Sequence, residues 1–211
     1  MAESSGFDRN VFVNCPFDAE YAPVLEAMLF CLIRLGLNPR IATERSDSGE
    51  TRIDKILELV QSSRYSIHDL SRCQAQTVGE HYRLNMPFEL GIDFGCRRFG
   101  PEPQSGKVFL VLEEKPYRYQ AAISDSAGFD IQAHKGDFEV AVRKLCNWIM
   151  SYGGSERVEA ARVVSEYADF QEWYWRRRLS EGASDEDIRD TSTAALMRAM
   201  RDWFESGSPR N

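Results

Sequence analysis

Two carboxylates, Asp69 and Glu89, occupy positions in this sequence from which they could do chemistry. Asp69 follows the stretch "RYSIH", which predicts a strand, and Glu89 lies in "NMPFELG", which predicts the start of a helix. Pro87 fits the first turn of such a helix, and we expect Glu89 in that turn, where the helix dipole favours an ionised carboxylate. An ionised, partly buried carboxylate suits a nucleophile or a stabiliser of positive charge better than a general acid.

Each carboxylate also has an ordinary structural explanation. Acidic residues are common in the first turn of a helix because the dipole favours them, and an Asp that follows a strand often forms a turn. Glu89 taken alone fits that structural role. Its combination with a strand-end Asp69, and with Gly91 and Gly95 on one face of the same helix, favours a site, because glycine lets a ligand or a strand approach closely.

Other chemistries lack their motifs. The sequence has no GxGxxG after the first predicted strand, no GxxxxGK[ST] and no GxSxG, so a dinucleotide fingerprint, a P-loop and a hydrolase elbow are not supported. The three histidines, His68, His81 and His134, are not spaced as metal ligands. We therefore expect no metal and no cofactor. A Ser-His-Asp triad stays open, although no motif favours it.

Strands and helices are predicted to alternate along residues 10–152. Short apolar runs predict strands at residues 10–16, 38–43, 64–71, 107–114 and 129–134. Helical spacing of apolar residues predicts one helix capped by Asp18 and ended by Gly36, and others over residues 53–62, from residue 83, and over 137–152. This alternation predicts an α/β fold in which helices cover both faces of a parallel sheet of about five strands. The loops at residues 14–18, 44–50 and 69–89 should then meet at the carboxyl edge of the sheet.

The composition changes after "SYGGSE" at residues 151–156, which predicts a hinge. We expect an α/β domain over residues 1–152 and a C-terminal helical extension over residues 153–211, made of two helices separated by Gly182. The many aromatic residues of this extension fit either an extra helical layer packed on the domain or a surface for oligomerisation or a partner. The three arginines at residues 176–178 fit a solvated helix face, because they stand alone.

The bulk composition narrows the class of protein. The 211 residues are 43% hydrophobic and 28% charged, as is typical of a globular protein, and carry a formal net charge of −7. An acidic chain is unsuited to general nucleic-acid binding but can hold a single nucleotide in a local pocket. The five cysteines include no CxxC pair, which favours reduced thiols. The sequence has no signal-peptide pattern and no apolar run of roughly 18 residues, so we expect a cytoplasmic protein without a membrane span.

The stretches "SRYSIHDLSR" and "LNMPFELGIDFG" resemble the pattern of nucleoside 2-deoxyribosyltransferase-like and bacterial TIR-like nucleotide-binding proteins. In those proteins a strand ends in I-x-D-L-[ST], and N-x-N-V-x-[YF]-E-L-G-x-A follows. The opening "VFVNCPFD" is similar to their first strand and loop, and the resemblance extends over about residues 10–152. The positions that match the two-part motif are Ile67, Asp69, Leu70, Ser71, Asn85, Phe88, Glu89, Leu90 and Gly91.

This resemblance implies a flavodoxin-like, doubly wound fold and a nucleotide site. It implies that Glu89 is the catalytic carboxylate for attack at an anomeric carbon and that Asp69 contributes to the nucleoside site. The residues that would bind the substrate are the first loop (Asn14, Cys15, Pro16, Phe17 and Asp18), the motif positions Ser71, Asn85 and Phe88, and, on weaker grounds, Arg45 and Ser48 for phosphate or ribose. The loop before Glu89 is longer than is usual in the family, and "NMP" replaces "NPNV", which leaves the substrate open.

The expected chemistry is cleavage or transfer at the N-glycosidic bond of NAD or a related nucleotide, which enters as substrate. Breaking the bond at ribose C1′ builds positive charge that one carboxylate can stabilise or capture. Nicotinamide leaves as a neutral base and needs no strong acid, whereas another base would need a donor such as His68, Tyr82 or water.

The alternative, from a different class, is a non-catalytic nucleotide or cyclic-nucleotide sensor that assembles through its C-terminal helices, and a third is an interaction domain of TIR type. The expected partners are a second copy of the chain and a protein activator, as in antiviral defence by NAD cleavage. Cys15 fits either a small packing residue or a reactive thiol.

Overall fold

The computed structural model describes residues 6–45, 47–72, 75, 84–121, 123, 128–152 and 158–209. Its sheet has five strands, all parallel, in the order β2-β1-β3-β4-β5. The strands are β1 (Asn10–Asn14), β2 (Asn38–Ile41), β3 (Tyr65–Asp69), β4 (Val108–Glu113) and β5 (Ile131–Ala133). The α/β fold with a flavodoxin-like parallel sheet is thereby confirmed.

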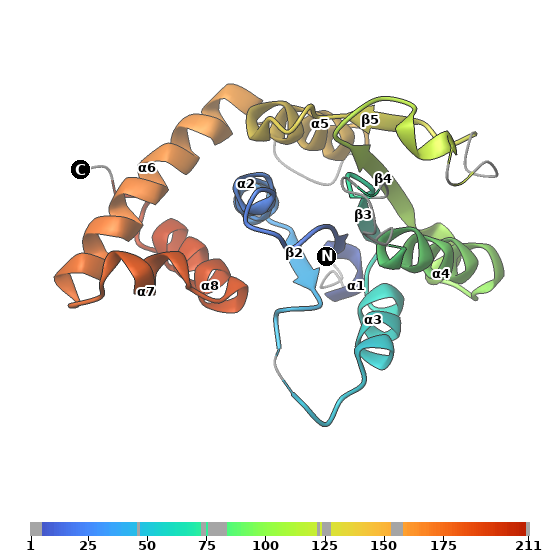
Figure 1. The fold of residues 1–211 in the computed structure, drawn as a ribbon, viewed down its shortest axis with the longest axis horizontal. Coiled ribbons are helices and arrows are strands. Elements are labelled where there is room, and N and C mark those ends of the chain that lie inside the picture. The colour runs from blue at the N-terminus through green and yellow to red at the C-terminus, as the bar shows by residue number, and fades with distance from the viewer. Residues whose placement is uncertain are drawn as a thin grey trace, which may run out of the picture.

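Eight α-helices accompany the sheet within the described residues. They are α1 (Gly6–Arg9), α2 (Ala22–Arg34), α3 (Arg52–Gln61), α4 (Asn85–Phe99), α5 (Phe138–Met150), α6 (Ala160–Ser180), α7 (Asp185–Arg189) and α8 (Thr193–Glu205), with 3-10 turns η1 (Gln104–Gly106) and η2 (Arg118–Ala121). Helix α2 packs beside α5, and α3 packs beside α4 (Figure 1). Each pair covers one face of the sheet, so the sheet is doubly wound.

The alternation of strand side chains assigns each residue to one face. Val11 and Val13 of β1 join the core under α2 and α5, whereas Phe12 between them joins Ile56 and Leu59 of α3 on the opposite face. A buried parallel strand therefore reads as an unbroken apolar run, as the sequence of β1 does.

The structure confirms the predicted end of α2 but not its predicted start. Gly36 has φ +73°, and its N–H donates to the carbonyl of Ile33 at 3.0 Å while that of Leu37 donates to Leu32 at 2.9 Å, which confirms the glycine stop. The prediction that Asp18 caps the helix was wrong. Tyr21 is the residue before α2 and Pro23 lies in its first turn, so Asp18 instead accepts from the N–H of Tyr21 at 3.1 Å in the preceding turn.

The C-terminal residues form three helices rather than the expected two; α6 and α8 pack on α2, and α7 packs on α6 (Figure 1). Phe30 of α2 is fully buried, with its ring centroid 5.3 Å from that of Tyr167, 5.5 Å from Phe170 and 5.7 Å from Trp203. Helix α2 is consequently buried on both sides, by the sheet and by α6 and α8. Of the hinge that the sequence predicts at residues 151–156, only residues 151 and 152 belong to the described part of the chain.

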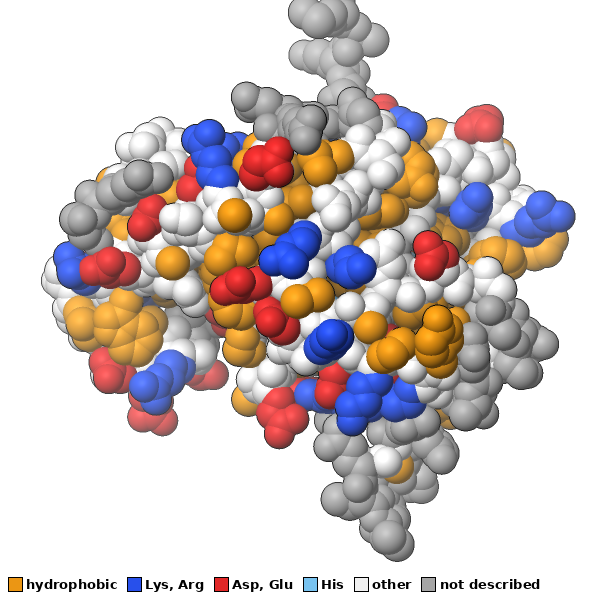
Figure 2. All heavy atoms as spheres, turned by 90° about the horizontal axis from the view of Figure 1, so that it is seen from above, with side chains coloured by type: hydrophobic (Ala, Val, Ile, Leu, Met, Phe, Trp, Pro, Cys, Tyr) orange, Lys and Arg blue, Asp and Glu red, His pale blue; other side chains and the backbone are white. Residues whose placement is uncertain are grey.

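Two observations concern the described helices and one face of the molecule. Among the described helices, none has the length and apolar content to cross a bilayer. On the face shown in Figure 2, Lys and Arg side chains are interspersed with Asp and Glu. That mixture differs from the continuous basic surface on which nucleic-acid binding depends.

Candidate functional site

Glu89 lies at the carboxyl edge of the sheet, on α4. Helix α4 begins at Asn85, so Glu89 falls in the second turn and not in the first, as we had expected. Its side chain is only 6% exposed, and its Oε1 lies 3.3 Å from Nη2 of Arg52, the first residue of α3. Burial raises the pKa of Glu89, and the nearby charge of Arg52 offsets this only in part. The direction is the opposite of the one that the helix dipole predicts.

Four buried polar side chains form a connected row that links α4 to β1, to β3 and to the residue before β4: Asn14, His68, Asp93 and Lys107. The amide of Asn14 donates to the carbonyl of Met86 at 2.9 Å and lies 3.0 Å from His68 Nδ1. Because that amide nitrogen is a donor, Nδ1 must accept, and the hydrogen on His68 Nε2 points at Asp93 Oδ2, 3.1 Å away. Asp93 Oδ1 in turn lies 3.2 Å from Nζ of Lys107.

This row is held by opposite charges inside the protein. The side chains of His68, Asp93 and Lys107 are all 0% exposed. Burial alone would raise the pKa of Asp93, but the contacts with His68 and Lys107 hold it below the usual value. The row fixes the start of α4 against the end of β1 and thereby fixes the position of Glu89.

Asp69 ends β3 as predicted, but its carboxylate is fully buried, and both of its oxygens have hydrogen-bond donors beside them. Oδ2 accepts from Tyr21 Oη at 2.6 Å and lies 3.1 Å from His134 Nε2, and Oδ1 accepts from the N–H of Ser71 at 2.9 Å. Burial raises the pKa of Asp69, whereas His134, Ser71 and Tyr21 lower it, and the balance lies below the usual value. The contacts in the structure are those of a carboxylate that ties β3 to α2 and β5.

Ser71, His134 and Asp69 are neighbours without the geometry of a catalytic triad. The N–H of Gly136 donates to His134 Nδ1 at 3.1 Å, so the imidazole carries its hydrogen on Nε2. Ser71 Oγ and Asp69 Oδ2 both face that same nitrogen, at 3.0 and 3.1 Å. In a triad the base meets the nucleophile with one nitrogen and the acid with the other.

Cys15 follows the end of β1, where Asn14 pairs with His68 of β3 and donates to the carbonyl of Met86 in α4. Burial raises the pKa of the Cys15 thiol, and the charges of Asp69, Glu89 and Asp18 raise it further. A thiol held protonated in this way is a poor nucleophile.

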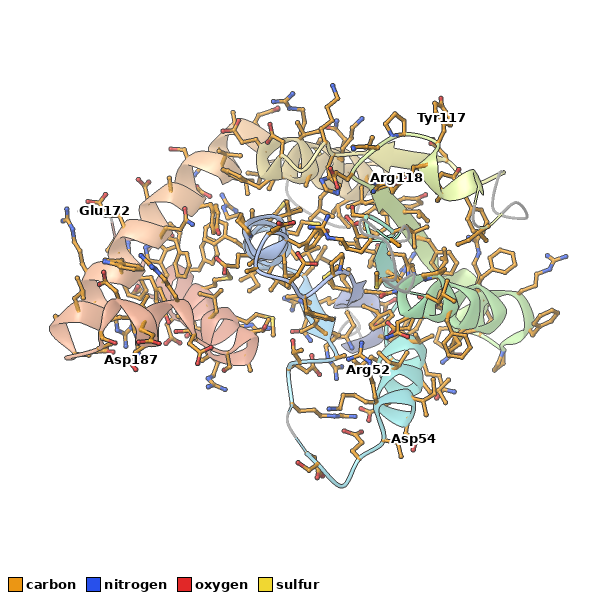
Figure 3. The ribbon with its side chains drawn as sticks, viewed as in Figure 1. Arg52, Asp54, Tyr117, Arg118, Glu172 and Asp187 are labelled. Carbon is orange, nitrogen blue, oxygen red and sulfur yellow. The ribbon has the colours of Figure 1, made fainter. Side chains whose placement is uncertain are left out.

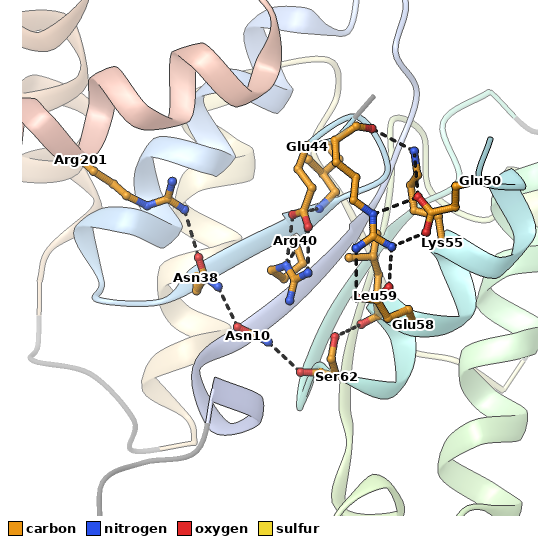
Figure 4. Close-up of polar contacts among 12 residues, drawn as sticks. Asn10, Asn38, Arg40, Glu44, Glu50, Lys55, Glu58, Leu59, Ser62 and Arg201 are labelled. Atoms are coloured by element: carbon orange, nitrogen blue, oxygen red, sulfur yellow. Dashed lines mark hydrogen bonds and ion pairs between the residues drawn. The ribbon is translucent and has the colours of Figure 1, made fainter. Parts of the chain in front are cut away.

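The remaining predicted residues divide into two groups. Pro16 is buried beside Cys15, Phe17 is 43% exposed, and Asp18 accepts from Arg72 at 3.1 Å. Asn85 and Phe88 are exposed in the first turn of α4. Arg45 lies apart from this group, because its guanidinium donates to Glu50 and to Glu58 of α3. Figure 4 shows Glu50 and Glu58 beside α3. Ser48 is exposed in the same loop. His81 and Tyr82 lie outside the described residues.

A cavity of about 520 Å³ opens at the same edge, on the side of α2 and α5. Ser71 is in its lining, whereas Glu89 is not. Its other lining residues are Glu20, Tyr21, Val24, Arg72, Glu114, Lys115, Arg118, His134 and Gly136. Figure 3 shows Arg118 of this lining near β4 and β5, apart from Arg52 beside α3.

Sequence reasoning missed Arg52, Arg72 and Arg118, and it gave His134 no role in a site. His134 and Arg72 follow β5 and β3, so the rule that strand ends converge could have included them. Arg52 carries no such signal, because its contact with Glu89 spans 37 residues of sequence.

Within the described residues no group of three or more His, Cys, Asp or Glu side chains is arranged to hold a metal ion. Comparison of the chain with protein-family models, with curated proteins and with solved structures found no match.

Proposed function

We propose that this protein cleaves or transfers at the N-glycosidic bond of NAD or a related nucleotide, with Glu89 as the catalytic carboxylate. The observation that carries the proposal is a buried carboxylate at the carboxyl edge of the sheet, paired with the half-exposed guanidinium of Arg52. Burial raises the pKa of this carboxylate. Perturbed carboxylates of this kind concentrate at functional sites. The resemblance of "NMPFELG" to the family motif adds independent support.

The chemistry requires little beyond such a carboxylate. As the C1′–N bond breaks, its electron pair returns to the pyridinium ring, so nicotinamide leaves neutral and the ribosyl C1′ becomes cationic. Glu89 stabilises that cation, and water or another acceptor then forms the new bond at C1′. The proton lost by the attacking water goes to Glu89, for which a raised pKa is favourable.

Arg52 occupies the place that the substrate must take. Its guanidinium lies against Glu89, yet its side chain is 53% exposed and reaches over from α3. Water can therefore solvate the guanidinium once it leaves Glu89. We therefore expect Arg52 to swing away from Glu89 when the ribose binds.

Base release measured by chromatography tests the proposal. The protein is incubated with NAD and with nucleosides, alongside Glu89→Gln and Glu89→Ala. A matched control is Glu172→Gln on the exposed face of α6, which removes the same charge away from the edge. We expect release by the wild type and by Glu172→Gln only; equal release by Glu89→Gln would refute the role of Glu89.

A non-catalytic nucleotide sensor is the second candidate, and it is favoured because both carboxylates already have protein partners. Glu89 is paired with Arg52, and Asp69 is held by three donors, an arrangement that suits binding without turnover. Saturable nucleotide binding without base release, in the presence of candidate activators, would support the sensor. Its assembly is best tested by measuring the mass of the full chain with and without nucleotide. Deleting α6 to α8 would instead expose Phe30 and the core around it.

A further inference from the structure

We propose that the 520 Å³ cavity between the ends of β3, β4 and β5 binds a phosphoryl or pyrophosphate group. The proposal does not rest on the function proposed for Glu89, which lies outside the lining of this cavity. Its volume falls within the range of about 300–1,000 Å³ that small-molecule sites occupy.

The charge of the lining favours an anion. Arg72, Lys115 and Arg118 contribute three positive charges, and Glu20 and Glu114 two negative ones, which leaves an excess of one positive charge. Asp18 and Glu113, just outside the lining, pair with the two arginines, whereas no ion pair of Lys115 is present within the described residues. Arginine forks and lysine ammonium groups are the usual protein ligands of phosphate oxygens.

The two guanidinium groups are held in place from behind. Asp18 accepts from Arg72 Nε at 3.1 Å, and Glu113, which is fully buried, accepts from Arg118 Nε at 2.6 Å. Neither acid is in the cavity lining. Glu114 lies between the two forks, 3.3 Å from Arg72 and 3.9 Å from Arg118. The arginines are thus positioned before a ligand arrives, which lowers the entropic cost of binding.

The floor of the cavity is polar, buried and rigid. His134 and Ser71 are 1% and 2% exposed, and both are fixed by the hydrogen bonds to Asp69 and Gly136 described above. Lys115 is exposed at the rim, and no contact of its ammonium group is present in the described part of the chain. It is therefore free to approach a ligand.

The carboxylate of Glu20 lies beside Arg72, where we expect the anion to bind. Glu20 Oε2 lies 3.2 Å from Arg72 Nη2, and the side chain of Glu20 is 82% exposed. An exposed ion pair is worth roughly 0–1 kcal/mol, so a phosphate oxygen can replace Glu20 at small cost. This arrangement predicts effects of opposite sign: removing Glu20 should tighten anion binding, whereas removing Lys115 or Arg72 should weaken it.

Calorimetric titration with inorganic pyrophosphate tests the proposal. We expect saturable binding by the wild type, about tenfold weaker binding by Lys115→Gln and by Arg72→Gln, and tighter binding by Glu20→Gln. Arg143→Gln, an equal loss of charge at an exposed position of α5, is the control and should bind like the wild type. Because Lys115 has no described contact, its variant should fold even if Arg72→Gln does not.

The result that overturns the proposal is the absence of saturable pyrophosphate binding by the wild type, or equal binding by Lys115→Gln, Glu20→Gln and the control. The titration is repeated on Glu89→Gln protein with NAD present, so that turnover cannot interfere. Competition between NAD and pyrophosphate supports the pocket as part of the nucleotide site, and simultaneous binding supports it as the site of a separate phosphorylated effector. Loss of base release in Glu89→Gln concerns only the other proposal, so the two can fail separately.

Discussion

Replacing Asp93 by Asn is expected to destabilise the protein by about 3–5 kcal/mol, because it leaves the ammonium group of Lys107 buried without an opposite charge. Both side chains are 0% exposed, with Nζ 3.2 Å from Oδ1. The carbonyl of Val60 also accepts from Nζ, at 2.7 Å, but it carries no formal charge. Asn keeps an oxygen that can accept from His68, so the substitution tests the charge and not the hydrogen bond.

A loss of about 3–5 kcal/mol is a large share of the roughly 5–15 kcal/mol that stabilises a typical protein. For a chain of this length it should lower the midpoint of thermal unfolding by about 6–20 °C. Urea unfolding followed by circular dichroism measures the free energy directly. Asp202→Asn, which removes the same charge from an exposed position of α8, is the matched control and should change stability by less than about 0.5 kcal/mol.

A double variant separates the ion pair from other effects. Asp93→Asn combined with Lys107→Met removes both charges, so no uncompensated ion remains and the double variant should lose less stability than Asp93→Asn alone. The reasoning is refuted if Asp93→Asn costs less than about 1 kcal/mol, or if the costs of the two single substitutions simply add.

Three further predictions concern stability and pH. Glu89→Gln should leave the free energy of unfolding at pH 7 unchanged or slightly higher. Burial raises the pKa of Glu89, so its ionised form lowers the stability of the fold above that pKa. A large loss of stability in urea unfolding would contradict this prediction. Asp69→Asn should lower the free energy of unfolding at pH 7. This loss relative to the wild type should shrink as the pH falls below about 4, because the lowered pKa of Asp69 stabilises the fold only while the carboxylate is ionised. A loss of stability that is the same at every pH would contradict the prediction. Trp203→Ala should cost about 3–5 kcal/mol because Trp203 is 1% exposed, whereas Trp175→Ala, at a half-buried position, should cost clearly less.

The sequence by itself determined the elements and the edge at which they converge. Apolar runs such as "VFV" and "VFLVL" predict strands buried on both faces, and strands that alternate with helices favour a single parallel sheet. That topology brings the carboxyl ends of β1 and β3 together, which is why Cys15, Asp69 and Glu89 could be placed in one neighbourhood. Such features depend on residues close in sequence, and for that reason local patterns contain them.

Only the tertiary structure decided what each side chain meets. Arg52 beside Glu89, His134 beside Asp69 and Lys107 beside Asp93 are pairs separated by 37, 65 and 14 residues, and no periodicity in the sequence joins them. Burial raises the pKa of Glu89, where its place in a helix predicted a lower one. The partners of Asp69 and Asp93 outweigh burial and lower the pKa of both carboxylates. The burial of Phe30 in α2 has the same origin, because the residues that cover it come from the other end of the chain.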